Sequence, residues 1–212
     1  MKKREKISEA VIRRLPRYYH CLKELEKDGI TRVSSTVISG MLNITASQVR
    51  QDFSNFGEFG QQGYGYDVDF LKTKISSLLG LDSAYNVIVV GGGNIGRALA
   101  NYRGFLNEGF NVLAVFDNRQ FDLELRDGIP LLSMEKLKKF IRENNVDICF
   151  IATNAESAKE VAALVIKSGI KAVWNFAPVD LYLGENVAVE NINMSESLFM
   201  LSYKLKNLTP QD

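Results

Sequence analysis

The chain has 212 residues, of which 46% are hydrophobic and 24% are charged, and its net charge is +1. These values are ordinary for a folded globular protein and exclude a disordered or collagen-like chain. No apolar run is long enough to cross a bilayer and no apolar core of a signal peptide follows the charged N-terminus, so we expect a cytoplasmic protein.

Cysteine and histidine are scarce. Cys21 and Cys149 are the only cysteines, and neither has metal-ligand spacing to His20, the single histidine. The sequence therefore predicts neither a disulfide framework nor a metal site.

Charge is distributed unevenly along the chain. Residues 1–50 contain 11 Lys and Arg against 5 Asp and Glu, whereas residues 81–212 contain 13 against 16. Clustered basic side chains displace counterions from phosphate backbones, so the first segment favours a polyanion as its partner. On charge alone, a basic helix face that is merely solvated explains the count equally well.

The first 55 residues carry three helical patterns. Apolar residues at three- and four-residue steps predict a helix over residues 8–28, divided at Pro16. A short helix around residues 37–42 can be capped by Ser34 or Ser35. A third helix over residues 46–55 starts with a capping box, in which Thr45 accepts from the Gln48 backbone and the Gln48 side chain reaches back. The last two helices have the proportions of a helix-turn-helix, with the second as the reading element.

Residues 56–66 are rich in glycine and aromatic residues, which is typical of a β-hairpin and unfavourable for a helix. A helix over residues 68–79 then leads to Gly80. We therefore expect a winged helix-turn-helix domain in residues 1–80 and a boundary at residues 80–85.

From residue 81 to residue 192, apolar runs alternate with helical patterns. We expect strands at residues 86–90, 111–116, 129–131, 146–151 and 172–175, an edge strand at residues 187–189, and helices at residues 95–106, 134–144 and 156–168. Such alternation predicts an α/β Rossmann domain, a doubly wound parallel sheet covered on both faces.

Residues 193–212 form a separate C-terminal segment. A helix is expected over residues 195–208, with Leu198, Leu201, Leu205 and Leu208 forming a narrow apolar seam. Such a seam fits a helix that docks on its own domain, and equally a helix that forms a dimer or is exchanged between subunits.

A dinucleotide fingerprint lies between the first strand and helix of the second domain, with the sequence Gly91-Gly92-Gly93-Asn94-Ile95-Gly96. Gly91 makes the turn, Gly93 admits the pyrophosphate, and Gly96 lets helix and strand pack closely. Asp117 follows 21 positions after Gly96, where a carboxylate binds the ribose hydroxyls and favours NAD over NADP. Arg119 argues mildly for NADP, and a glycine-rich turn that binds CoA is a further alternative.

Ligands of doubly wound sheets lie outside the carboxyl ends of the strands, which makes Thr153, Ala177 and Pro178 further candidates for cofactor contact. None of them supplies an acid or base. A dehydrogenase usually needs a proton donor near the nicotinamide, and Tyr102 is the best local candidate, although a packed helix aromatic explains it as well. A small NAD-dependent oxidoreductase with an accessory helical domain is the alternative function.

Polar side chains on and around the reading helix are candidates for contact with double-stranded DNA. Arginine pairs with guanine and glutamine with adenine, whereas hydroxyls and additional arginines suit phosphates. The candidates are Ser47, Gln48, Arg50 and Gln51 on the helix, and Arg13, Arg14, Arg17, Ser34 and Ser35 around it.

Taken together, these residues resemble the Rex family of redox-sensing transcriptional repressors over nearly the whole chain. The resemblance is carried by residues 14–19, 32–35, 48–54, 56–66, 91–96 and 175–179. It implies a homodimer that holds a palindromic operator, exchanges its C-terminal helices and releases DNA when NADH binds. It also implies that NADH and NAD+ bind at residues 91–96 and Asp117 with Tyr102 near the nicotinamide, and that Ser47, Gln48, Arg50 and the wing residues Gly63 and Tyr64 face DNA.

The sequence departs from the family pattern at the wing and at one residue pair. Gln61 and Gln62 stand at a wing tip that is usually basic, which predicts weaker attraction to phosphate. His20 and Asn193 stand where Rex proteins often have Arg and Asp, so a switch that exchanges that ion pair is not expected here.

Overall fold

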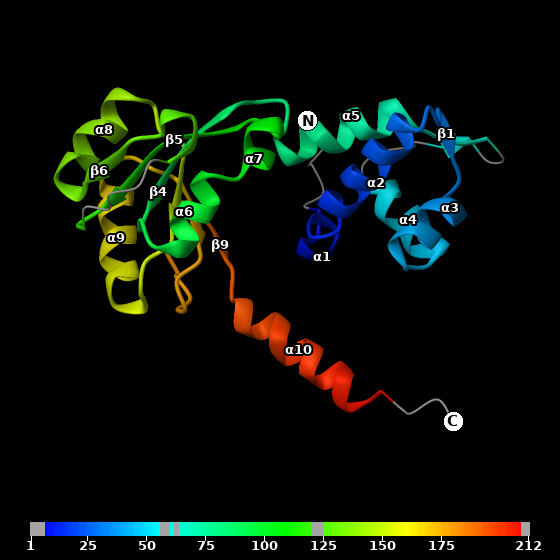
Figure 1. The fold of residues 1–212 in the computed structure, drawn as a ribbon. Helices are drawn as coiled ribbons and strands as arrows, with labels where there is room; N and C mark the ends of the chain where they lie inside the picture. The colour runs from blue at the N-terminus through cyan, green and yellow to red at the C-terminus, as the bar shows by residue number, and fades with distance from the viewer. Residues whose placement is uncertain (1–6, 56–59, 62–63, 120–124, 209–212) are drawn as a thin grey trace. The chain divides into compact units, whose positions relative to one another are not determined.

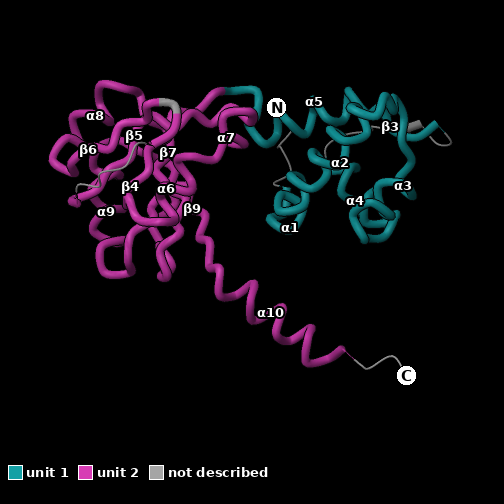
Figure 2. The backbone as a smooth tube through the Cα atoms, in the orientation of Figure 1, with its two compact units in different colours: residues 1–83 teal, residues 84–212 magenta. Residues whose placement is uncertain are grey.

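The computed structural model describes residues 7–55, 60–61, 64–119 and 125–208 (Figure 1). The chain divides into two compact units, residues 1–83 and residues 84–212 (Figure 2). Each unit has its own hydrophobic core.

The first unit is a helical domain with a small antiparallel sheet. Its elements are α1 (Glu9–Ile12), α2 (Leu15–Lys27), β1 (Arg32–Val33), α3 (Ser35–Leu42), α4 (Ala46–Ser54), β2 (Gly60–Gln61), β3 (Gly65–Asp67) and α5 (Val68–Leu79). The strand order is β1-β3-β2. Apolar side chains from α2, α3, α4 and α5 meet in one core. The predicted helices are confirmed, and so is the hairpin pairing in its described part, where β2 runs antiparallel to β3; residues 56–59 and 62–63 lie outside the described residues.

The helix-turn-helix is formed by α3 and α4. Ser34 caps α3 by accepting from the backbone N–H of Val37, and Thr45 caps α4 by accepting from that of Gln48 at 3.1 Å. Asn43 makes the tight turn between them with a left-handed backbone (φ +52°), which asparagine tolerates better than most residues. The prediction that the Gln48 side chain reaches back to the start of the helix is wrong, because that side chain donates to Asp52 instead.

The second unit has the predicted Rossmann architecture. Its strands are β4 (Tyr85–Val90), β5 (Phe110–Asp117), β6 (Leu131–Ser133), β7 (Ile148–Ile151), β8 (Ala172–Asn175) and β9 (Ala188–Asn191). Its helices are α6 (Asn94–Ala100), α7 (Arg103–Asn107), α8 (Leu137–Glu143), α9 (Ala155–Lys167) and α10 (Met194–Lys206), with 3-10 turns at Arg126–Gly128 and Met134–Lys136.

All six strands are parallel, in the order β6-β5-β4-β7-β8-β9. Successive residues of β4 face opposite sides of the sheet: Ile88 and Val90 pack in the core with α8 and α9, whereas Val87 and Val89 pack with α6 and α7. A strand covered on both faces is apolar throughout, as the run from Val87 to Val90 is.

The single helix expected over residues 95–106 is wrong, since the chain breaks into α6 and α7 between Ala100 and Arg103. The Asn101 backbone carbonyl accepts from the Arg126 guanidinium at 3.0 Å. The Asn101 side-chain oxygen accepts from the Arg126 backbone N–H at 2.9 Å. Tyr102 is extended (ψ 108°) and folds its ring over Gly104, where a Cβ would lie 2.3 Å from the ring. A contact with a residue 25 positions away thus ends α6, and helical periodicity carries no sign of it.

Helix α10 has no buried residue. The seam leucines Leu198, Leu201, Leu205 and Leu208 are 59–70% exposed. Within the part of the chain that the structure describes, no helix is both long enough and apolar enough to span a membrane.

Candidate functional site

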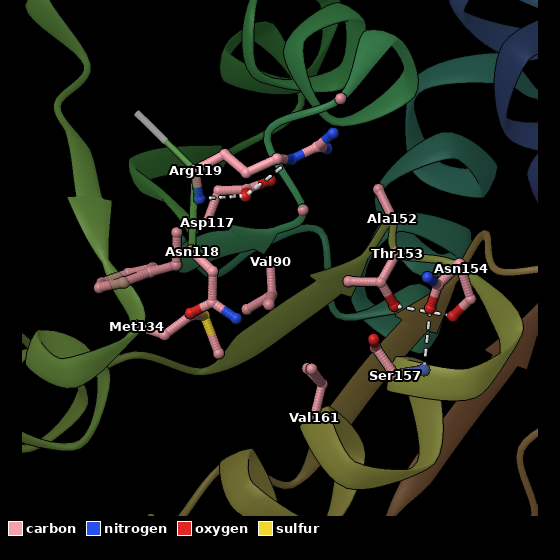
Figure 3. A pocket seen from close by; sticks show the side chains of 13 residues that line it. Val90, Asp117, Asn118, Arg119, Met134, Ala152, Thr153, Asn154, Ser157 and Val161 are labelled. Atoms are coloured by element: carbon pink, nitrogen blue, oxygen red, sulfur yellow. Dashed lines mark hydrogen bonds and ion pairs between the residues drawn. The ribbon is translucent and has the colours of Figure 1, made fainter. Parts of the chain in front are cut away.

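A cavity of about 580 Å³ opens at the carboxyl ends of β4, β5 and β7 (Figure 3). The order of the strands along the chain reverses between β4 and β7, which is where doubly wound sheets bind dinucleotides. The lining residues come from these strand ends and the loops that follow them, from the 3-10 turn after β6 and from α9: Val90, Gly91, Gly93, Phe116, Asp117, Asn118, Arg119, Met134, Ala152, Thr153, Asn154, Ser157 and Val161.

The three glycines of the fingerprint have different surroundings. Gly91 has φ +107°, and a Cβ there would lie 2.4 Å from the Ala152 carbonyl oxygen. A Cβ at Gly96 would lie 1.7 Å from the Gly91 carbonyl oxygen. At Gly93, which precedes α6, a Cβ would meet no heavy atom within 4 Å. Gly91 and Gly96 are therefore required by packing, whereas Gly93 leaves open the space above the start of the helix.

Asp117 is held at the end of β5 with its side chain 10% exposed. One carboxylate oxygen accepts from the backbone N–H of Gly92 at 2.7 Å, and the other accepts from that of Arg119 at 2.8 Å. The Arg119 guanidinium lies 3.5 Å from the second oxygen, and its side chain is 70% exposed. The acid is thus oriented by the glycine loop itself, at the edge of the cavity.

The opposite wall of the cavity is polar and comes from the start of α9 (Figure 3). Asn154 caps α9 by accepting from the backbone N–H of Ser157 at 2.9 Å, and the Thr153 hydroxyl donates to the Asn154 carbonyl at 3.2 Å. Thr153 was a candidate from the sequence, whereas Asn154 and Ser157 were not chosen. The signal available for Asn154 was its position directly after Thr153 in the loop that follows β7, whereas Ser157 lies in the first turn of α9.

These features fit an adenine dinucleotide. The open space at Gly93, at the start of α6, could take a pyrophosphate, and the Asp117 carboxylate could accept hydrogen bonds from ribose hydroxyls. Asn94 and Ile95 begin α6: the Asn94 side chain accepts from Arg97 at 2.6 Å, and Ile95 is 39% exposed.

Four of the cofactor candidates line this cavity: Gly91, Gly93, Asp117 and Thr153. Gly92, Asn94, Ile95 and Gly96 belong to the same loop and helix start but are not among the lining residues, and Tyr102, Ala177 and Pro178 lie elsewhere. Tyr102 is 61% exposed, packs edge-on against Phe105 and lines a separate hollow of about 150 Å³. Ala177 is buried and Pro178 is exposed in the loop after β8. Their roles stay predictions from the family resemblance.

The loop after β8 is tied to β9 by two asparagines. The buried Asn175 donates from its amide to the Val179 carbonyl at 2.6 Å and to the Asn191 side chain at 2.8 Å. The Asn191 amide in turn bonds both backbone groups of Leu181, at 3.0 and 3.2 Å. Asn193 follows closely and caps α10 by accepting from the Ser195 N–H at 3.1 Å, a role that asparagine and aspartate share.

In the first unit, the outer face of α4 is polar. Ser47, Arg50 and Gln51 are exposed, whereas Val49, Asp52 and Phe53 are buried. The spacing of the exposed residues places them on one side of the helix, as a reading helix requires.

Behind this face, Asp52 is completely buried. Arg14 grips it with two hydrogen bonds of 2.6 and 2.7 Å, the Tyr18 hydroxyl donates at 2.7 Å, and the Gln48 amide donates at 2.8 Å. Burial alone would raise the pKa of Asp52, but these hydrogen bonds outweigh it and lower that pKa below its ordinary value. The same interactions raise the pKa of Arg14.

Asp52 was missed by the sequence analysis, which gave Arg14 and Gln48 to DNA. A buried carboxylate has no periodic signature, and its partner Arg14 lies 38 positions away. In the structure the Arg14 guanidinium is bound to Asp52. Arg14 is therefore poorly suited to contact a phosphate.

The other candidates near α4 have local partners. Arg13 pairs with Glu9, Arg17 donates to the Leu42 carbonyl at the end of α3, and Arg50 donates to the Ser35 hydroxyl at 3.1 Å. Arg13, Arg17 and Arg50 are all exposed.

At the wing, the Tyr64 ring is 71% exposed and lies 5.9 Å from the Arg32 guanidinium. The sequence analysis did not choose Arg32. Gly63, Gln62 and the side chain of Gln61 lie outside the described residues.

Among the described residues, no group of three or more His, Cys, Asp or Glu side chains could hold a metal ion. The first unit has the elements of a DNA-reading domain and the second has those of a dinucleotide-binding domain. The fold and site thus define a helix-turn-helix protein with a nucleotide-binding Rossmann domain.

Comparisons with known proteins agree with this class and specify it. Residues 6–54 match a family model described as "Putative DNA-binding protein N-terminus", and residues 82–179 match one described as "CoA binding domain". The chain is 47% identical over 97% of its length, and 92% of the relative's, to the redox-sensing transcriptional repressor Rex of Caldanaerobacter subterraneus subsp. tengcongensis. It is 50% identical to Rex of Clostridioides difficile, over 94% of this chain and 96% of the relative.

Solved structures give the same result. A crystal structure of RSP with β-NAD+ and operator DNA has a TM-score of 0.88 and 45% identity, covering 95% of this chain and 93% of that one. RSP with β-NADH has a TM-score of 0.85 and 42% identity, covering 94% of each chain. RSP is described as a Rex-family repressor. The present chain belongs to the Rex family of redox-sensing transcriptional repressors, and its relatives are named as repressors rather than enzymes.

Proposed function

We propose that the chain is a cytoplasmic transcriptional repressor that binds an operator as a homodimer, senses the NADH to NAD+ ratio, and leaves DNA when NADH binds. The observation that carries this proposal is the coexistence of the cradle at Gly93 and Asp117 with the polar face of α4, in a chain of the Rex family. The relative RSP has been crystallised with β-NAD+ and operator DNA, and also with β-NADH.

For DNA, we assign base contacts to the first turns of α4, through Ser47, Gln48, Arg50 and Gln51. The N-terminal residues of a recognition helix contact base edges in the major groove. Phosphate contacts are assigned to Arg13, Arg17, Ser34, Ser35 and the wing residues Arg32, Gly63 and Tyr64. Arg14 is assigned instead to the support of α4, because Asp52 occupies its guanidinium.

For the nucleotide, we assign the pyrophosphate to residues 91–96 and the adenosine ribose to Asp117. The cavity ends at the start of α9, where Thr153, Asn154 and Ser157 supply polar groups. The bound cofactor supplies a nicotinamide that is cationic when oxidised and neutral when reduced, and the chain's task is to bind these two forms differently. Residues around that ring, with Tyr102, Ala177 and Pro178 as candidates, therefore carry the discrimination.

A ligand shifts a two-state equilibrium only by its differential affinity for the two states. Moving a repressor from 99% DNA-competent to 1% requires a preference of roughly 5.5 kcal/mol. NADH must therefore favour the DNA-incompetent arrangement by an energy of that order.

For the homodimer, two apolar surfaces of the second unit support the assignment. The α10 leucine seam is exposed. The sheet also has an apolar hollow of about 550 Å³, lined mainly by aromatic and aliphatic side chains, among them Phe105, Phe110, Phe150 and Trp174. Apolar surface gains roughly 25 cal/mol per Å² when it is removed from water, so a second copy that covers these surfaces is stabilised. We propose that α10 is exchanged between the two subunits.

Operator selection tests the proposal. Duplexes selected from random DNA with NAD+ present are titrated with full-length protein, and NADH, NADPH and CoA are then added separately. We expect NADH to release the protein, and the other two to act only at far higher concentration. Operator binding that persists at saturating NADH would disprove the redox switch, and release by CoA at lower concentration would favour the CoA module.

A further inference from the structure

The carboxylate of Asp52 has no capacity left for a further partner. Each of its two oxygens accepts two hydrogen bonds, one from Arg14 and one from either Tyr18 or Gln48. Its side chain is 1% exposed, so no water competes for these sites. Asp52 therefore holds the side chains of Arg14, Tyr18 and Gln48 in fixed positions around its carboxylate.

This arrangement fixes the orientation of the Gln48 amide. An ionised carboxylate can only accept, so Gln48 must turn its NH₂ group toward Asp52 and its oxygen away from it. No donor in the described chain reaches that oxygen. Since no buried side-chain oxygen or nitrogen among the described residues lacks a partner, the Gln48 amide oxygen is open to solvent.

Gln48 also stands where a reading helix meets bases. It is the third residue of α4, in the first helical turn, next to the exposed Ser47. Thr45 caps that turn through the Gln48 backbone N–H, so both the backbone and the side chain of Gln48 are held.

We propose that Asp52 is a positioning residue for base recognition, which locks Gln48 with its amide oxygen outward so that Gln48 reads adenine. This inference rests on the proposed function. The outward oxygen accepts from the adenine N6 amino group, while the second hydrogen of the Gln48 amide nitrogen donates to adenine N7. Guanine and thymine present only acceptors there, so they repel that oxygen and can take at most one hydrogen bond from the amide N–H, and cytosine likewise offers only one hydrogen bond.

In this proposal Asp52 contributes to the choice of base by Gln48 and does not contribute to the binding of phosphate. A glutamine without this anchor rotates its amide and presents either end to a base, so it discriminates less and must be ordered on binding. Gln48 preorganised by Asp52 presents one end only.

The test uses full-length protein and three variants, on duplexes that differ by one base pair from the best duplex selected by the wild type. Gln48→Ala removes the reader. Arg14→Met with Tyr18→Phe and Asp52→Leu replaces the anchor by apolar side chains, which leaves no buried charge unpaired. Glu26→Gln with Lys72→Met is the matched control, because it removes an ion pair between α2 and α5 that does not involve α4.

We expect the wild type to prefer adenine by about 10-fold or more at one position of each half-site. Gln48→Ala and the apolar triple variant should both lower this preference to less than about 3-fold at that same position, while preferences elsewhere are retained. The control should keep it. A merely structural role for Asp52 would weaken all positions equally.

A folded triple variant that keeps the full adenine preference overturns the proposal, as does a Gln48-dependent position that reads guanine or thymine. If the wild type selects no sequence, the proposed function fails as well. If the triple variant does not fold, NMR of the wild type tests the proposal instead. The signal of the Gln48 side-chain amide is assigned by its absence in Gln48→Ala, and its order parameter should be as high as that of rigid backbone. An order parameter below about 0.6 there overturns the proposal.

Discussion

Gly96 packs so closely on Gly91 that a Cβ at residue 96 would lie 1.7 Å from the Gly91 carbonyl oxygen. Three residues earlier, a Cβ at Gly93 would meet nothing within 4 Å. Two glycines of one motif thus differ in their surroundings: Gly96 is required by packing, whereas Gly93 borders open space, where we propose that the pyrophosphate binds.

Alanine substitutions separate these purposes. Gly93→Ala should leave the melting temperature within about 2 °C of the wild type, because the Cβ has space, but should weaken NADH binding at least about 10-fold by filling the pyrophosphate cradle. Gly96→Ala should lower the melting temperature by about 5 °C or more through overpacking. Scanning calorimetry and NADH titration measure both, and tight NADH binding by Gly93→Ala would contradict the assignment of the cradle.

Replacement of Asp117 tests cofactor choice. Asp117→Ser replaces the charged, two-oxygen acceptor of the ribose hydroxyls by a shorter neutral hydroxyl and removes the carboxylate contact with the Gly92 N–H, so NADH affinity should fall about 10- to 100-fold. NADPH should lose less, since a negative charge is removed and the Arg119 guanidinium is released from its ion pair. Isothermal titration with both cofactors measures the ratio, and Glu143→Gln on the exposed side of α8 serves as control. Equal losses for both cofactors would count against Asp117 as the selector.

Each unit contains one buried cysteine that can report on its opening. Burial raises the pKa of the Cys21 thiol to about 11, and it also raises that of Cys149. Since the thiolate is the nucleophile, both thiols should react with an aromatic disulfide at pH 7.5 only when their unit opens. Saturating NADH should slow the reaction of Cys149 up to about 100-fold at 100 times the dissociation constant and leave Cys21 little changed.

Single-cysteine proteins, Cys21→Ala and Cys149→Ala, assign the two rates. Protection of Cys21 to the same extent as Cys149 would mean that the nucleotide stabilises both units together, which would contradict binding confined to the second unit.

The Asp52 network should make the first unit sensitive to acid. The pKa of the Asp52 carboxyl in the folded protein lies below the ordinary value of 3.8. The stabilisation that the ionised carboxylate provides is therefore complete above pH 3.8 and is lost as the pH falls toward the folded pKa. The stability of the wild type relative to the apolar triple variant should therefore decline below about pH 4 and be constant from pH 5 to 7. Urea unfolding at several pH values measures this difference, and a rise toward low pH would contradict the assigned direction.

The exposed seam of α10 predicts the oligomeric state. Leu201→Glu should raise the dimer dissociation constant at least about 10-fold, because a buried leucine contributes about 1.5–3 kcal/mol and the change occurs in both subunits. Tyr203→Glu, on the opposite side of the helix, is the matched control and should change it little. Analytical ultracentrifugation decides, and an unaltered dimer in Leu201→Glu would place the interface elsewhere.

Most of the fold could be predicted from the sequence, because the signals involved are local. Ser34 and Thr45 cap helices within four residues of themselves, and the apolar run of β4 reflects burial on both faces. The fingerprint glycines and Asp117 were likewise identifiable, since they lie at or directly after the ends of two successive strands, β4 and β5.

What could not be predicted depends on distant partners. The break between α6 and α7 needs Arg126, and the environment of Gln48 needs Asp52 to be buried by Arg14 and Tyr18. Hydrophobic periodicity describes one element at a time, so it contains no information on such pairs.

Two asparagines, Asn175 and Asn191, connect one end of the sheet to the start of the C-terminal helix. Asn175 bonds Asn191 through its side chain, and its carbonyl accepts from the Ile192 N–H at 2.8 Å. Asn193 then caps α10 directly. The loop at residues 176–181 and the start of α10 are therefore joined through the same two asparagines, and we expect a displacement of that loop to shift the residues from which α10 begins.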